Sequence, residues 1–346
     1  MINIKENEKL SEYTTFRVGG PARYFVSVKT EQELMETLAF AKQKELEVFV
    51  LGGGSNVLVS DSGFDGLVVH NQIKGIELDE AGSVAAMSGD LWDDLVRLSV
   101  DKNLAGIECL SRVPGSAGGA IVQNIGCYGQ TLSDTVNTVT VIDLVSLEKK
   151  TYTREECKFE YRGSIFKNNP GKFFVLKFHL NLVKNGKPTI KYHDIVQRFA
   201  NNPNPSLQEV RHVLIEIRAS KGMVIDDCHE IFKSVGSFFK NPVVSKKKFE
   251  SVKQSLEDSE IAGDWYWEVG AGNIKIAAAR VLQKSGFPKG YSEENVGVSP
   301  KQPLAIINLG SAKASEIKNF AEKIKNTVKQ KFGIALEEEA LYVGNF

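Results

Sequence analysis

Three glycine-rich segments in the N-terminal part of the chain are the clearest candidates for a binding site. They read FRVGGPA at residues 16–22, LGGGSN at 51–56 and RVPGSAGGAIVQNIGCYG at 112–129. Successive glycines can expose backbone N–H groups without a Cβ in the way, and such a concave arrangement binds phosphate oxygens. One such segment alone is as consistent with an ordinary tight turn, but three together favour a cofactor that contains a diphosphate.

The glycines follow neither common nucleotide-binding fingerprint. LGGGSNVLV runs into a predicted strand instead of a helix, and the sequence contains no G-x-x-x-x-G-K-[ST] motif. The pattern therefore predicts a diphosphate cofactor that is held by loops outside a Rossmann frame.

Two further segments carry side chains that could do chemistry. VGSFFKNP, residues 235–242, places the hydroxyl of Ser237 between Gly236 and two phenylalanines, with Lys240 behind them. A serine in such a turn usually hydrogen-bonds its own backbone. EYRGSIFK, residues 160–167, contains Arg162, whose guanidinium is permanently charged and can bind a carboxylate through two hydrogen bonds. A structural arginine paired with a surface acid is the alternative.

The elements that must position these residues are of mixed type. A capping box at Thr30 and Glu33 predicts a helix, and a strand follows at 48–51. Further helices are predicted over 91–106, 274–286 and 315–332. Short strands are predicted within 83–89, 138–144, 172–183, 213–219, 303–309 and 341–346. Because helices and strands do not alternate strictly, an α+β fold is favoured over a doubly wound sheet.

Composition limits the class of protein. The chain has 346 residues, and its 43 basic side chains balance its 43 acidic ones, so bulk charge gives no reason to expect nucleic acid or anionic lipid as a partner. The length predicts about two domains. Residues 1–18 lack an apolar stretch behind a basic end, and no window approaches the ~20 apolar residues of a membrane helix. We therefore expect a soluble, cytoplasmic protein without a membrane partner. We further expect a monomer.

No metal site is predicted. The cysteines are too scattered for a paired-thiol motif and are expected to be reduced packing residues; they are Cys109, Cys127, Cys157 and Cys228. The histidines show no ligand spacing; they are His70, His179, His193, His212 and His229.

Several segments resemble one known family. TTFRVGGPA, LGGGSNVLVSD and VPGSAGGAIVQNIGCYG resemble the FAD-binding region of the MurB family, the UDP-N-acetylenolpyruvoylglucosamine reductases of bacterial peptidoglycan synthesis. EYRGSIFK and GSFFKNPVV resemble its two catalytic segments, and the motifs occur in the family's order from about residue 10 to 344.

The resemblance implies an α+β fold with a vanillyl-alcohol-oxidase/PCMH-type FAD-binding module of two subdomains and a C-terminal α+β substrate-binding domain. We expect the subdomains at 1–75 and 76–205 and the C-terminal domain at 206–346, because QRFANNPNPSLQEVRH reads as a polar linker.

The reaction that the resemblance implies has two halves. NADPH reduces FAD, and the flavin then delivers hydride to the enolpyruvyl double bond of UDP-N-acetylglucosamine enolpyruvate, giving UDP-N-acetylmuramate. Hydride addition leaves an enolate-like carbanion beside a carboxylate, which requires positive charge and a proton. By family position, Arg162 stabilises the carboxylate and Ser237 donates the proton.

The third catalytic residue implied by the resemblance lies in GIALEEEALYVG. Counting back from Gly344 places it at Glu339, with Glu337 as the fallback. The segment departs from the family pattern, because Glu338 stands where proline is usual and Ala340 stands where valine is common. A run of three acids is ordinarily a solvated face.

The resemblance also implies the binding residues. Those expected to contact FAD are Gly52, Gly53, Gly54, Ser55, Asn56, Pro114, Gly115, Ser116, Gly119, Asn124 and Gly126. Those expected to contact the UDP-sugar are Tyr192, Lys221, Asn241, Lys275 and Gln302. Cys127 is expected to be a packing residue and not a covalent flavin tether. The insert at 185–205 resembles the longer type I enzymes, whose tyrosine-bearing loop covers the substrate.

Two other functions remain open from the sequence. An FAD oxidase of the same module would use oxygen and a small alcohol, although such enzymes often tether the flavin to His or Cys and GGGSN offers no histidine. A UDP-sugar-binding protein without chemistry would have no need of Arg162, Ser237 and a C-terminal acid together.

Overall fold

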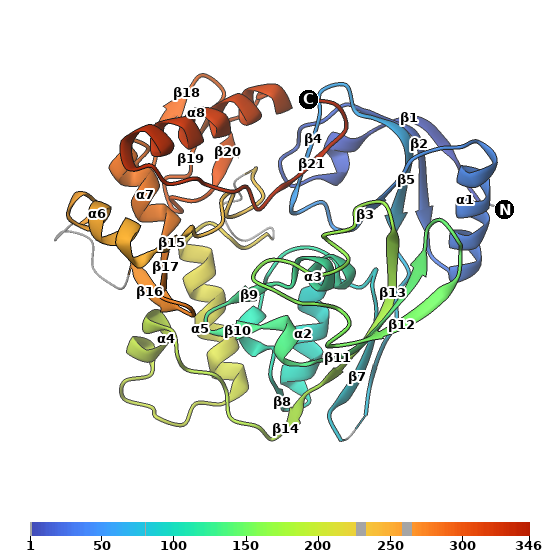
Figure 1. Ribbon diagram of the computed structural model, residues 1–346. Coiled ribbons are helices and arrows are strands. Elements are labelled where there is room, and N and C mark those ends of the chain that lie inside the picture. Colours follow the sequence, from blue (N-terminus) through green and yellow to red (C-terminus); the bar gives the residue numbers. More distant parts are fainter. Residues whose placement is uncertain (1, 80, 226–232, 258–264) are drawn as a thin grey trace. The chain divides into compact units, whose positions relative to one another are not determined.

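The computed structural model describes residues 2–79, 81–225, 233–257 and 265–346 (Figure 1). The chain forms two compact units. Unit 1 consists of Met1–Lys9, Pro21–Gly54 and Phe64–Ile231, and unit 2 consists of Leu10–Gly20, Ser55–Gly63 and Phe232–Phe346. The chain therefore leaves unit 1 and enters unit 2 between Gly54 and Ser55, inside the glycine segment 51–56. The domain limits inferred from the sequence remain predictions, and Cys228 and His229 lie outside the described residues.

The first sheet of unit 1 has the strand order β1–β2–β5–β3, with β2, β5 and β3 parallel and β1 antiparallel. Its strands are β1 (Lys5–Lys9), β2 (Pro21–Val28), β5 (Phe64–Asn71) and β3 (Val48–Leu51). Helix α1 (Glu31–Gln43) lies beside this sheet (Figure 1) and buries Leu34 and Leu38 against Val26. The Thr30 hydroxyl accepts a 3.1 Å hydrogen bond from Glu33 N, which confirms the predicted helix start.

The second sheet of unit 1 is antiparallel, in the order β12–β11–β13–β7–β6. Its strands are β12 (Lys149–Thr153), β11 (Val136–Asp143), β13 (Phe173–Asn181), β7 (Ser83–Met87) and β6 (Ile76–Leu78). The helices of this region are α2 (Trp92–Asp101), α3 (Ala117–Gln123), α4 (His193–Arg198) and α5 (Leu207–Ser220), with 3-10 turns at Glu108–Leu110 and Leu132–Asp134. Trp92, Ile121 and Leu207 share one buried cluster with the sheet residues Val139 and Phe178.

Two short strand pairs complete unit 1: β9 (Gly126–Cys127) with β10 (Gln130–Thr131), and β8 (Leu104–Ala105) with β14 (Val183–Lys184). The second pair corrects one prediction. The helix expected over 91–106 ends at Asp101, because Asn103 takes a positive φ of 58° and the next two residues form β8.

A second prediction was wrong at residues 213–219. They were expected to form a strand, but in the structure they lie in α5 (Leu207–Ser220). Leu207, Val210, Leu214 and Ile217 are buried at helical spacing, and Ser206 with Glu209 forms a complete capping box. Burial of this apolar stripe outweighed the strand preference of the β-branched residues. Helix α5 also begins inside the stretch that was read as a linker.

Unit 2 has two three-stranded sheets and one parallel strand pair. Their strands are β15 (Val243–Ser245), β17 (Asn273–Ile276) and β16 (Tyr266–Val269); β18 (Ser292–Glu293), β19 (Val296–Val298) and β20 (Ile306–Asn308); and β21 (Leu341–Val343) with β4 (Val57–Val59). Its helices are α6 (Lys246–Leu256), α7 (Ala278–Ser285) and α8 (Ala314–Phe332), with a 3-10 turn at Leu10–Tyr13. Ile317, Phe320 and Ile324 of α8 lie in its core, and Gly333 ends the helix at φ 60°, both as predicted.

The predicted helix at 274–286 starts later than expected, because residues 273–276 form β17; Gly286 ends α7 at φ 103° as predicted. The other predicted strands are confirmed by β7, β11, β13, β20 and β21. Among the residues that the structure describes, none of the helices is both long and apolar enough to span a membrane.

Candidate active site

Two of the glycine segments are in direct contact within unit 1. A Cβ on Gly53 would lie 2.6 Å from the Cα of Gly115, and a Cβ on Gly52 would lie 2.3 Å from the Oγ of Ser116. Both separations are below van der Waals contact, so larger residues would force the two loops apart. Gly54 and Gly115 also have positive φ values, 63° and 114°. This contact of two backbone loops fits a diphosphate held by loops.

The backbone N–H groups in the first turn of α3 already donate hydrogen bonds to other protein atoms. Ala117 N donates to Asp90 O and Gly118 N donates to Ser88 O, both at 2.8 Å, and the Ser116 hydroxyl accepts from Gly119 N at 3.2 Å. Because these helix donors are occupied, a diphosphate here would depend on the loop backbones and not on the helix terminus.

Asp93 fixes the loop that precedes α3, and the sequence reading missed it. Its carboxylate accepts two hydrogen bonds from the Arg211 guanidinium, at 2.7 and 2.8 Å, and one of 2.6 Å from Arg112 N. Burial alone would raise the pKa of Asp93, but these donors outweigh it and hold the pKa below its usual value. The pair thus ties α2 and α5 to the segment 112–116.

Arg162 lies in a tight turn against Gly126, one of the residues predicted to bind the flavin. Its Nη2 donates to Gly126 O at 2.6 Å, and a Cβ on Gly126 would lie 3.3 Å from Nη1. Asn124 holds the start of the turn, because its Nδ2 donates to Glu160 O at 2.9 Å while its Oδ1 accepts from Ser133 N at 3.1 Å. The structure therefore places predicted catalytic and cofactor residues together.

Tyr128, which the sequence reading did not single out, lies two residues after Gly126 and contacts two predicted substrate residues. Its ring makes an edge contact with the Tyr192 ring at a centroid distance of 5.3 Å, and the Lys221 ammonium lies 5.7 Å from its centroid. Lys221 also binds the Asp194 carboxylate at 2.9 Å. Burial raises the pKa of Tyr192. Tyr192 and Lys221, far apart in the sequence, are thus neighbours.

Arg218 is a second residue that the sequence reading missed. It is 4% exposed, and its Nη2 donates to Met223 O at 3.3 Å. The sequence signal that could have identified Arg218 is its position four residues after Leu214, on the apolar stripe of α5. Burial raises the pKa of the Cys127 thiol, while the positive charges of Arg218 and Arg162 act against this shift. Cys127 donates to Cys109 O at 3.2 Å, and Cys109, Cys127 and Cys157 are free thiols.

In unit 2, Ser237 follows a turn that another serine caps. Gly236 takes φ 74°, and its N–H donates to the Oγ of Ser234 at 3.2 Å. The serine that caps this turn is therefore Ser234. Phe238 and Phe239 are buried in the core of the unit, where Phe238 contacts Phe16 at a centroid distance of 6.2 Å. They anchor the segment that carries Ser237.

Three chain segments meet at Phe238. Its N–H donates to Leu304 O and its carbonyl accepts from Glu339 N, both at 2.8 Å. Lys240 N donates to Glu337 O at 2.9 Å, so that Phe239 and Glu338 form an antiparallel bridge. Unit 2 thereby brings together the segments of Ser237 and Glu339.

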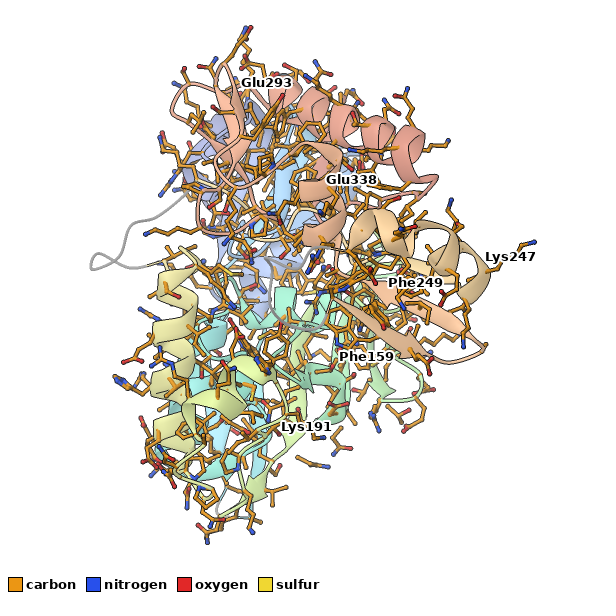
Figure 2. All side chains as sticks on the ribbon, turned by 90° about the vertical axis from the view of Figure 1, so that its left-hand side faces the viewer. Phe159, Lys191, Lys247, Phe249, Glu293 and Glu338 are labelled. Carbon is orange, nitrogen blue, oxygen red and sulfur yellow. The ribbon has the colours of Figure 1, made fainter. Side chains whose placement is uncertain are left out.

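The three adjacent glutamates have different surroundings. Glu337, the fallback residue, is exposed and pairs with Lys240 at 3.2 Å. Glu338, labelled in Figure 2, pairs with Lys325 at 2.7 Å. The carbonyl of Glu339 accepts from the Nδ2 of Asn56 at 3.1 Å, which joins a predicted flavin residue to the acidic segment.

The remaining predicted substrate residues of unit 2 lie beside these segments. The Oδ1 of Asn241 accepts from Ala278 N at 2.9 Å and so caps α7. Lys275 lies in β17 opposite Val243, with its ammonium 5.5 Å from the Trp267 ring centroid. Gln302 N donates to Ser299 Oγ at 3.2 Å, in the turn that leads to Leu304.

Comparisons with known proteins agree with this arrangement. Residues 22–146 match the family profile described as an FAD binding domain. Residues 199–343 match that of the UDP-N-acetylenolpyruvoylglucosamine reductase C-terminal domain. The fold and the site together define an FAD oxidoreductase with a PCMH-type FAD-binding module followed by an α+β C-terminal domain.

Whole-length relatives identify the family. The UDP-N-acetylenolpyruvoylglucosamine reductase of Thermobifida fusca is 35% identical, over 99% of this chain and 98% of that protein, and that of Flavobacterium johnsoniae is 35% identical over 98% and 99%. The crystal structure of the enzyme from Thermus caldophilus superposes with a TM-score of 0.65 at 25% identity, covering 99% of both chains. The chain belongs to the UDP-N-acetylenolpyruvoylglucosamine reductase (MurB) family, the UDP-N-acetylmuramate dehydrogenases of peptidoglycan synthesis.

Proposed function

We propose that this chain reduces UDP-N-acetylglucosamine enolpyruvate to UDP-N-acetylmuramate with electrons from NADPH. FAD, when bound, accepts and passes on the hydride. The contacting loops at 52–54 and 114–116, with Ser55, Asn56, Gly119, Asn124 and Gly126, are the proposed FAD site. The proposed UDP-sugar contacts are Tyr192, Lys221, Asn241, Lys275 and Gln302.

Each catalytic residue has one proposed task. Arg162 binds the carboxylate of the substrate and stabilises the charge that hydride addition places beside it. Ser237 donates the proton to the carbanion, and Glu339 supports the same intermediate. The observation that carries this proposal is the pair of backbone hydrogen bonds at Phe238, because they join the segments of Ser237 and Glu339. The turn before Ser237 is capped by the hydroxyl of Ser234.

Flavin spectroscopy tests the proposal on the purified full-length protein. We expect a yellow protein that anaerobic NADPH bleaches and that the enolpyruvyl UDP-sugar then recolours. UDP-N-acetylglucosamine without the enolpyruvyl group is the matched control and is expected to leave the bleached protein unchanged. Comparing NADPH with NADH in the first step measures the nucleotide preference.

Three outcomes would contradict the proposal. Bleaching by small alcohols with oxygen as acceptor would indicate an oxidase. A colourless protein that still binds the UDP-sugar would indicate a binding protein without redox chemistry. Recolouring by the control sugar would show that the enolpyruvyl group is not the acceptor.

We further propose that residues 185–205 form the substrate-covering loop of a type I enzyme. The support is the contact of Tyr192 with Tyr128, next to Lys221. We expect the UDP-sugar to protect the chain around Tyr192 from limited proteolysis, because closure over a ligand removes the backbone from solvent. Equal cleavage with and without the UDP-sugar would rule the closing loop out.

A further inference from the structure

Arg162 has a backbone conformation that its side chain disfavours. Glu160 and Gly163 exchange both backbone hydrogen bonds, each at 3.1 Å, so Tyr161 and Arg162 form a two-residue turn. Arg162 takes φ 57°, in the left-handed region where a Cβ approaches the following carbonyl. A strained non-glycine residue persists only where its surroundings hold it, and such residues cluster at functional sites.

The ammonium group of Lys167 supplies one of these restraints. Its Nζ donates to Arg162 O at 3.1 Å and to the Oε1 of Gln123, at the end of α3, at 2.6 Å. The carbonyl of Arg162 is thus linked to α3, the helix that follows the proposed FAD-binding loop 114–116. The guanidinium at the other end of the same residue is held by Gly126 O at 2.6 Å.

The backbone of Lys167 is itself fixed to the same helix. Lys167 N donates to the Oγ of Ser164 at 3.2 Å, and that hydroxyl donates to Val122 O at 2.7 Å. Phe166, the residue before it, is buried in the core of unit 1. These contacts tie the backbone of Lys167 to α3 and to the core of unit 1.

We propose that Lys167 is a positioning residue for the reduction step: it holds the Arg162 turn so that the guanidinium is presented in one orientation. The inference depends on the role proposed above for Arg162. Without the ammonium group, the strained turn can relax, and the guanidinium then loses its fixed direction. Misplacement of a binding group by ~1 Å costs about 10²-fold in rate.

The test separates the two half-reactions of the FAD-loaded enzyme in a stopped-flow instrument. In Lys167→Met, we expect flavin reduction by NADPH to stay within about twofold of wild type and reoxidation by the enolpyruvyl UDP-sugar to slow ~10- to 10²-fold. Lys167→Arg keeps the charge and the donors and is expected to recover the rate to within about fivefold. Lys172→Met, an exposed change of the same type nearby, is expected to leave both rates unchanged.

A double substitution asks whether Lys167 acts through Arg162. If it does, Arg162→Ala/Lys167→Met reoxidises no more slowly than Arg162→Ala alone. Two results would overturn the positioning role of Lys167 and leave the role of Arg162 intact. One is a double variant that is slower than Arg162→Ala by the full factor seen in Lys167→Met. The other is normal reoxidation in Lys167→Met while Arg162→Ala is slow. Normal reoxidation in Arg162→Ala overturns the role proposed for Arg162, and the inference with it.

A second variant covers the case in which Lys167→Met does not fold. Gln123→Ala removes the side-chain oxygen that accepts from the Lys167 ammonium at 2.6 Å and leaves the lysine in place. It is expected to slow reoxidation ~3- to 10-fold and to leave NADPH reduction unchanged. Unchanged reoxidation in Gln123→Ala would then overturn the proposal.

Discussion

Ser237→Ala is expected to slow reoxidation of the bleached enzyme by the enolpyruvyl UDP-sugar by ~10²-fold or more, the usual scale for losing a general acid. Bleaching by NADPH is expected to change by less than about twofold, because no proton transfer to the substrate occurs in that step. The two rates are measured separately by anaerobic stopped-flow absorbance.

Ser234→Ala is the matched control, since Ser234 lies three residues earlier and its hydroxyl caps the turn. It is expected to lower the free energy of unfolding by about 1 kcal/mol, for one lost hydrogen bond, with both half-reactions near wild type. If Ser237→Ala instead slows both halves equally, or matches Ser234→Ala in stability and rate, Ser237 is a turn residue and not the proton donor.

Arg162→Met is expected to slow the same reoxidation step by ~10²- to 10³-fold, because it removes a donor that stabilises developing charge. Arg162→Lys keeps the charge but lacks the planar pair of donors, so it should recover only part of the loss. Arg154→Lys, an exposed change in the same connection, controls for loss of an arginine as such. Equal rates in Arg162→Lys and wild type would show that the reaction does not depend on two parallel hydrogen bonds from the guanidinium to the substrate carboxylate.

The backbone conformation of Arg162 predicts a difference in stability between two variants of this residue. At φ 57°, glycine is free of the strain that a Cβ imposes. Arg162→Gly is therefore expected to be more stable to thermal unfolding than Arg162→Ala by about 1 kcal/mol, although both are slow enzymes. Equal stability of the two variants would show that the turn is not strained.

Local signals predicted much of the fold. The capping residue Thr30 and the terminal glycines Gly286 and Gly333 act where the sequence placed them, because caps depend on a few neighbouring residues. The strand prediction at 213–219 was wrong because the signal for the correct element extends over more residues than that segment contains. Its β-branched residues resemble a strand locally, but the stripe that selects α5 extends back to Leu207, outside the window.

Residue type alone drew attention to the glycine segments, two of which are in contact in the structure. Arg162 was selected through the family resemblance, and the roles of all these residues stay predictions. The supporting residues could not be predicted, because their roles arise from contacts between distant segments. Asp93 binds Arg211 across 118 positions, and nothing in either segment alone indicates the pair. Tyr128 likewise gains its importance only when Tyr192 and Lys221 are folded beside it.

The pairing of β4 with β21 bears on how this chain matures on the ribosome. Val57–Val59 is synthesised long before its partner Leu341–Val343. Until β21 has been synthesised, the short apolar strand β4 lacks this partner, and Phe16 and Val18 lack most of their core neighbours, which lie after residue 232. An unpaired apolar strand is exposed to premature association, so we expect the pairing of β21 with β4 to be a late step of folding.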